Sequence, residues 1–130
     1  MTELLEQMIQ EKSLSRPDAE LFEKSGNVNE EFEEVDVLKW LASEYRVSFT
    51  RLEEVELDRE LLSLFPARIL LKEELLPLSR ANGSVKIATS RLFATRGLDT
   101  LKSLTGLNMI PVLAPSDVLQ REIKKRLGVG

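Results

Sequence analysis

The sequence predicts an α+β fold in which N-terminal helices precede a small α/β sandwich with a sheet of three or four strands. The first observation is a hairpin signal. Two apolar runs, from Leu75 to Leu78 and from Ser84 to Thr89, are separated by Asn82-Gly83. Asn-Gly is typical of a type I′ turn, because both central residues of that turn need a positive φ. The other two observations are a helix and strand directly after the hairpin, and helical periodicity in the chain before it.

A helix and a third strand complete this central unit. Residues 96–104 carry leucines spaced for one face of a helix. Gly106 ends that helix, because glycine adopts the left-handed conformation without a Cβ clash. The apolar run 109–113 then predicts a strand. The order strand, turn, strand, helix, strand is typical of a small sheet with flanking helices.

Three helices are expected in the N-terminal part of the chain. Residues 4–12 place apolar side chains on one helical face. Ser15 and Pro17 are typical of a helix start, and a second short helix is expected to follow them. The longest helix is expected over residues 30–45, with a short strand over residues 47–52 directly after it.

Two short helices are expected between that strand and the hairpin. Asp58 is a typical cap for one over residues 59–64, and Pro66 is a typical first residue for the next. At the end of the chain, Ser116 and Asp117 are expected to cap a last helix over residues 118–127. Flanking helices of this kind would cover the faces of the sheet.

Length and composition narrow the domain organisation and the chemistry. We divide the 130 residues into an N-terminal helical segment, 1–36, and an α/β domain, 37–130, which can also form one compact unit. The chain has no cysteine and no histidine, so it lacks disulfides, thiolate ligands and the commonest general base. No apolar run approaches the roughly 20 residues of a membrane helix, so no direct membrane insertion is expected.

The sequence contains no catalytic motif that we recognise. The patterns GxxxxGK[ST], GxSxG, HExxH and GxGxxG are all missing. The acidic run over residues 30–36 is interpreted as a solvated helix face rather than a metal site, because neighbouring carboxylates splay around a helix axis. We therefore predict a binding or interaction module that is not an enzyme and needs no cofactor or metal.

Charge is distributed unevenly along the chain. Residues 1–60 hold 17 acidic and 7 basic residues, whereas residues 61–130 hold 5 acidic and 11 basic residues. The asymmetry could orient the domain against a partner, but attraction between the two halves within the fold is the favoured interpretation. Lys124, Lys125 and Arg126 suit the end of a helix, where cations offset the dipole. Without interleaved aromatic residues they do not indicate nucleic-acid binding.

Several linked segments resemble a known family. In order along the chain they are LASEYRVSFTRL, VELDRELLSLFPARILLKEELLPLSRANGSVKIATS and FATRGLDTLKSLTGLNMIPVLAPSDVLQREIKKRLG. Together they resemble the N-terminal domain of the ATPases of type II secretion and type IV pilus assembly, and the related MshEN domains. The resemblance covers residues 38–127, and the helices before them match more loosely.

The resemblance implies a recruitment and regulatory role. Such a domain precedes the ATPase core and docks on the cytoplasmic part of an inner-membrane platform protein. This implies a cytoplasmic chain that is held at the inner membrane through its partner, with the rest of the ATPase as a second partner. Whether the chain is a fragment of a motor or a stand-alone adaptor stays open.

Some relatives bind cyclic di-GMP through RLGxxL-type motifs on the N-terminal helices. In this chain, Leu4 stands at the arginine position and Glu6 at the glycine position. A glutamate there would repel the dinucleotide, so cyclic di-GMP binding is not expected, and a nucleotide-sensing function remains the alternative. Relatives also often carry Ala-x-x-Asp-Pro after the hairpin, where this chain has Arg91 and Leu92.

The candidate partner-binding residues are Arg91, Phe93, Arg96, Glu33 and Glu34. In the loop after the hairpin, the Phe93 ring could anchor a partner between Arg91 and Arg96. Glu33 and Glu34 could steer a partner through the acidic face of the longest helix. An equally weighted alternative packs Phe93 beneath its own loop and leaves both arginines solvated.

Overall fold

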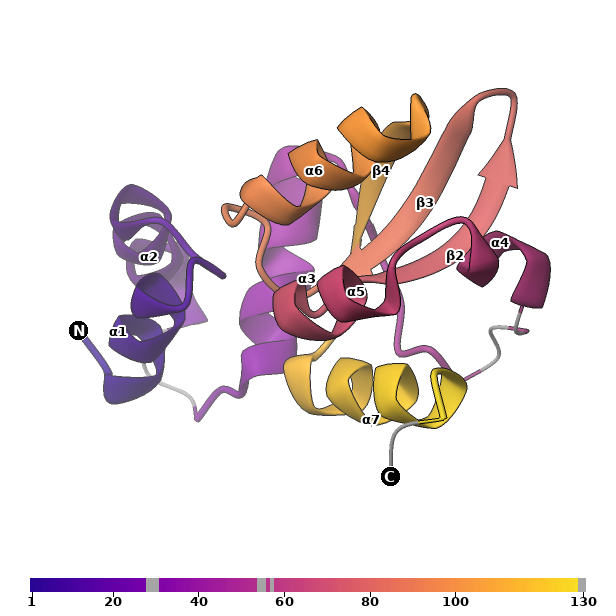
Figure 1. The fold of residues 1–130 in the computed structure, drawn as a ribbon. Helices are drawn as coiled ribbons and strands as arrows, with labels where there is room; N and C mark the ends of the chain where they lie inside the picture. The colour runs from indigo at the N-terminus through magenta and orange to yellow at the C-terminus, as the bar shows by residue number, and fades with distance from the viewer. Residues whose placement is uncertain (28–30, 54–55, 57, 129–130) are drawn as a thin grey trace.

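A four-stranded sheet in the order β1-β4-β3-β2 lies at the centre of the computed structural model (Figure 1). The structure describes residues 1–27, 31–53, 56 and 58–128. Strands β2 and β3 are antiparallel, and β4 is parallel to both β3 and β1. The strands are β1 (Ser48–Phe49), β2 (Leu76–Ala81), β3 (Ser84–Thr89) and β4 (Asn108–Leu113). The predicted α+β fold is confirmed.

The hairpin forms at the predicted Asn-Gly pair. Asn82 and Gly83 have φ angles of 49° and 81°, the positive values that a type I′ turn requires. The first strand runs from Leu76 to Ala81 rather than from Leu75 to Leu78. Its exposed second half pairs with β3 although Ser79 and Arg80 are polar. Apolar character therefore indicated only the buried half of this strand.

Helices of the C-terminal part cover the sheet. They are α4 (Arg59–Ser63), α5 (Ala67–Glu73), α6 (Arg96–Thr105) and α7 (Ser116–Arg126). Figure 1 shows α6 beside β4, and α7 running beneath α4 and α5, at the end of the molecule opposite the hairpin turn. The Asp58 carboxylate caps α4 as predicted, because its Oδ1 accepts a 3.0 Å hydrogen bond from Leu61 N–H.

The N-terminal helices form a second buried cluster. They are α1 (Glu3–Gln10), α2 (Arg16–Phe22), a π-helical turn (Glu23–Asn27) and α3 (Glu34–Tyr45). Leu5, Met8, Phe22 and Leu41 are buried in this cluster together with Leu113, the last residue of β4, so the helices pack against the sheet where β4 ends. In the described part of the chain, every helix is too short or too polar to cross a membrane.

Helix α3 begins later and β1 is shorter than predicted. Glu33 is extended, with φ −113° and ψ 171°, and its N–H donates to Asp36 Oδ2 at 2.9 Å, so the helix starts at Glu34. The suggested cap at residues 29–31 lies partly outside the described residues. Strand β1 covers only Ser48–Phe49, because the chain turns away at Leu52, which has φ 63°.

The start of α7 also differs from the prediction. Ser116 is the first residue of the helix rather than its cap, and Pro115 occupies the cap position without a side-chain hydrogen bond. The missing cap is supplied by a residue of α3, as described below. Local sequence could not show this, because the capping group lies far away in the chain.

Candidate docking site

The described residues contain no cluster of three or more acidic side chains that could hold a metal ion. The sequence also lacks histidine and cysteine, the side chains that most often ligate transition metals.

In the loop after β3, the candidate residues Arg91 and Phe93 both contact other parts of the fold. Arg91 forms an ion pair with Glu74, and its N–H donates to Thr89 Oγ1 at 3.0 Å. Phe93 is half-buried, and its ring meets Tyr45 edge to face at a centroid distance of 5.5 Å. The N–H of Phe93 also donates to the Lys12 carbonyl at 3.0 Å. This loop thus joins the N-terminal helices to the sheet.

Tyr45 connects the same joint to α2. Its hydroxyl donates to Asp18 Oδ2 at 2.6 Å, and Ser15 Oγ donates to the same oxygen at 2.6 Å. Asp18 is 8% exposed, so the two hydroxyls satisfy a buried carboxylate. The hydrogen bond to Asp18, followed by desolvation, raises the pKa of Tyr45 to about 12. Phe93 and Tyr45 together therefore serve the packing of this joint.

Arg96 is the exposed one of the three candidate residues in and after the loop that follows β3. It is the first residue of α6 and borders a shallow depression of about 460 Å³. Asp99 and Leu104 line the same depression, and Leu104 is 59% exposed. The Arg96 side chain is therefore exposed to solvent, whereas Phe93 packs against Tyr45 where the N-terminal helices meet the sheet.

Glu33 and Glu34 lie at the start of α3 in different surroundings. Glu33 is exposed, whereas Glu34 is half-buried. Ser116 N–H and Ser116 Oγ donate to Glu34 Oε1 and Oε2, each at 2.8 Å. Glu34 thereby caps α7, whose own cap residue is a proline. Its carboxylate links α3 to α7, while Glu33 stays accessible at the surface.

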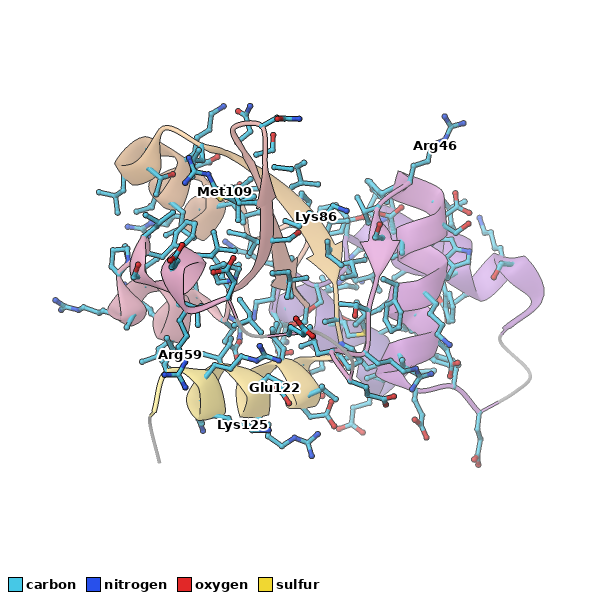
Figure 2. The ribbon with its side chains drawn as sticks, turned by 90° about the vertical axis from the view of Figure 1, so that its right-hand side faces the viewer. Arg46, Arg59, Lys86, Met109, Glu122 and Lys125 are labelled. Atoms are coloured by element: carbon cyan, nitrogen blue, oxygen red, sulfur yellow. The ribbon has the colours of Figure 1, made fainter. Side chains whose placement is uncertain are left out.

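A larger cleft lies elsewhere, where α4 and the start of α5 face the C-terminal end of α7. It measures about 840 Å³. Figure 2 shows Arg59 above the end of α7, with Glu122 and Lys125 on that helix. Arg126 also lines the cleft, and its Nε lies 3.0 Å from Glu122 Oε2. Sequence reasoning did not find this site, because its two walls are far apart in the chain; the only signal was the basic run at residues 124–126.

Comparison with known families decides the identity of the chain. Residues 45–129 match the model of the MshEN domain, which is more than half of the chain. The chain belongs to the MshEN domain family. The resemblance to the N-terminal domains of secretion and pilus ATPases is thereby confirmed. A comparison with curated protein sequences gives no match.

Solved structures share the fold of this MshEN domain. A structure of MshE with cdg has a TM-score of 0.66 at 17% identity and covers 97% of this chain and 99% of that chain. The N-terminal domain of XpsE has a TM-score of 0.60 at 12% identity and covers 92% of this chain and 90% of that chain. A second crystal form of the XpsE domain gives 0.55 at 14% identity, with 97% and 92% covered.

Helix α1 carries the positions where the dinucleotide motif of relatives was expected, and it lies before the residues that match the MshEN model. Leu4 is half-buried against the helical cluster. Glu6 forms a bidentate ion pair with Arg16, in which the two guanidinium nitrogens each donate to one carboxylate oxygen at 3.2 Å. The hydrogen bond from Arg16 lowers the pKa of Glu6. The charged form of the Glu6 carboxylate is therefore favoured, with Arg16 as its partner.

Proposed function

We propose that this MshEN domain is a non-catalytic interaction and regulatory module of a secretion or pilus-assembly ATPase. In this proposal it recruits the motor to the cytoplasmic domain of an inner-membrane platform protein, and so holds the motor at that membrane. The match of residues 45–129 to the MshEN domain carries the proposal. The fold shared with the N-terminal domain of XpsE along most of the chain supports it.

The surface of the domain is compatible with such a role. The described residues offer an open cleft with cations on its walls, and they contain no metal-binding cluster. A partner recognised through charged residues at the rim of an interface binds with a salt-dependent rate. We therefore expect the affinity of this domain for its partner to fall as the ionic strength rises.

A binding measurement tests the recruitment. The purified chain is immobilised and exposed to the cytoplasmic domain of the platform protein encoded beside its gene, at 50 and 300 mM salt. We expect saturable binding that is weaker at the higher salt concentration. Absence of binding at 50 mM salt with tens of micromolar partner would contradict the proposal.

Nucleotide sensing is the second candidate function. The similarity to a structure of MshE with cdg favours it, whereas Leu4 and Glu6 at the motif positions count against it. Calorimetric titration with cyclic di-GMP separates the two functions. Our proposal predicts no heat of binding, and micromolar or tighter affinity would instead establish a dinucleotide sensor.

A further inference from the structure

The cleft between α4 and α7 has cations on both walls. Arg59 projects from the first turn of α4, and Lys125 projects from the last turn of α7. Both are exposed, and neither forms an ion pair with another described side chain. Arg126 and Glu122 pair with each other on the α7 wall. The lining thus carries three cationic side chains and one acidic side chain, a formal excess of two positive charges.

The floor of the cleft is apolar. Leu62 and Phe65 line it and are 9% and 5% exposed, and the half-buried Leu127 lines it as well. An apolar floor with a few charged groups at the rim is typical of a recognition site for a partner that inserts a side chain.

Among the groups that the structure describes, the ion pairs each lie within one half of the chain. Ion pairs among described groups join Met1 to Glu23, Glu6 to Arg16, Glu74 to Arg91 and Glu122 to Arg126. Each joins two residues of the same half, either 1–60 or 61–130. The favoured sequence interpretation, attraction between the halves, therefore has no support from ion pairs between described side chains. The cations at the cleft rim remain available to an external acidic group.

We propose that the α4–α7 cleft is the docking site for an acidic segment of the platform protein, with an apolar side chain of that segment seated on the floor. This inference rests on the proposed function and names the surface that performs it. Carboxylates of the segment meet Arg59 and Lys125 at the rim, which sets the association rate and its salt dependence. The apolar side chain supplies the contact that holds the complex together.

The first test reverses the rim charges. Arg59→Glu/Lys125→Glu changes both walls, and Arg80→Glu/Lys86→Glu makes the same change of net charge on exposed residues of the hairpin strands. Arg59→Ala/Lys125→Ala repeats the test without new acids, because a glutamate in the last turn of α7 opposes the helix dipole. Thermal melts establish that each variant is folded. We expect the cleft reversal to weaken binding to the platform domain by about tenfold or more, the alanine pair to weaken it less, and the hairpin pair to change it by less than about twofold.

Equal loss in the cleft and hairpin variants would show a non-specific charge effect and would overturn the inference. Wild-type binding by the cleft variants would also overturn it while leaving the recruitment function standing. Absence of platform binding by the wild-type chain would instead contradict the recruitment function, and the cleft would then be decided by the second test.

The second test uses a synthetic probe and does not depend on the platform protein. A fluorescein-labelled 12-residue peptide of alternating glutamate and leucine is titrated with the full chain, and a lysine–leucine peptide is the control. We expect the acidic peptide alone to bind, with affinity lost in Arg59→Glu/Lys125→Glu. No binding, or equal binding by the variant, overturns the inference. Displacement of the peptide by stoichiometric GTP would assign the cleft to a small anion, and a wild-type dimer lost in the variant would assign it to a second copy; either outcome overturns the proposal.

Discussion

Glu34 is predicted to stabilise the fold from the start of α3 by capping α7. The substitution Glu34→Ala removes both acceptors of Ser116, each at 2.8 Å. Because Pro115 provides no side-chain cap, the first turn of α7 would then lose its capping acceptor. Loss of an N-cap costs about 0.5–2 kcal/mol, and hydrogen bonds to a charged group contribute about 1.5–3 kcal/mol each. Partial exposure lets water replace part of this, so we expect a net loss of about 2 kcal/mol in the free energy of unfolding.

Urea denaturation followed by circular dichroism measures this loss. The matched control is Glu31→Ala, which removes an exposed acid from the same acidic run. Glu34→Gln keeps one acceptor oxygen and should fall between Glu34→Ala and the control. Combined with Ser116→Ala, the double-mutant cycle should give a coupling of about 1 kcal/mol, since the two side chains are in direct contact. If Glu34→Ala lies within about 0.5 kcal/mol of Glu31→Ala, the capping argument is wrong.

Three further predictions concern a packing contact, a titration and a ligand. Gly97→Ala should lower the free energy of unfolding by about 1–3 kcal/mol, because the new Cβ would lie 2.8 Å from Glu73 Cβ. This clash should outweigh the better helix propensity of alanine. An unchanged midpoint in urea denaturation would show that α5 and α6 can separate freely. Tyr45 is the only tyrosine, so absorbance at 295 nm should titrate near pH 12 rather than near 10. Because this pKa is raised in the folded state, the hydrogen bond to Asp18 stabilises the fold below about pH 10 and that contribution is lost toward pH 12; a midpoint near 10 would contradict the bond. Cyclic di-GMP should give no thermal shift, and a rise in melting temperature that Glu6→Gly enlarges would restore the dinucleotide alternative.

Local signals predicted the parts of the fold that depend on neighbouring residues. The Asn82-Gly83 turn, the Asp58 cap and the end of α6 at Gly106 all form as expected. In each of these cases the residue acts on backbone groups within a few positions. The residues that decide each of these features lie within a short stretch of sequence, so the feature could be predicted from the sequence.

The prediction failed where the deciding partner lies far away in the chain. Ser116 was expected to cap α7, but its own groups are capped by Glu34, which is 82 residues away. For Phe93 the sequence left a partner anchor and a ring packed beneath its own loop open, and in the structure its ring meets Tyr45, 48 positions away. Whether Phe93 also meets a partner stays a prediction, as do the roles proposed for Arg91, Arg96 and Glu33.

The cleft shows the same limit for the candidate site. Arg59 and Lys125 are 66 positions apart in the sequence, and they line one cleft because α7 packs against α5 with α4 nearby. No spacing rule links them in the sequence. The basic run at the end of α7 was explained by the helix dipole alone, which accounts for its position but not for its place on the wall of a cleft.

The most direct test of the docking function is a hydrogen-exchange footprint of the full chain, measured with and without the cytoplasmic domain of the platform protein. Docking in the cleft predicts slower exchange in residues 59–67 and 122–128, and no comparable change in the hairpin at residues 79–86. Protection confined to other segments would keep the recruitment function and reject the cleft. An exchange pattern unchanged everywhere, at tens of micromolar partner and 50 mM salt, would contradict the claim that this domain docks its motor on the platform.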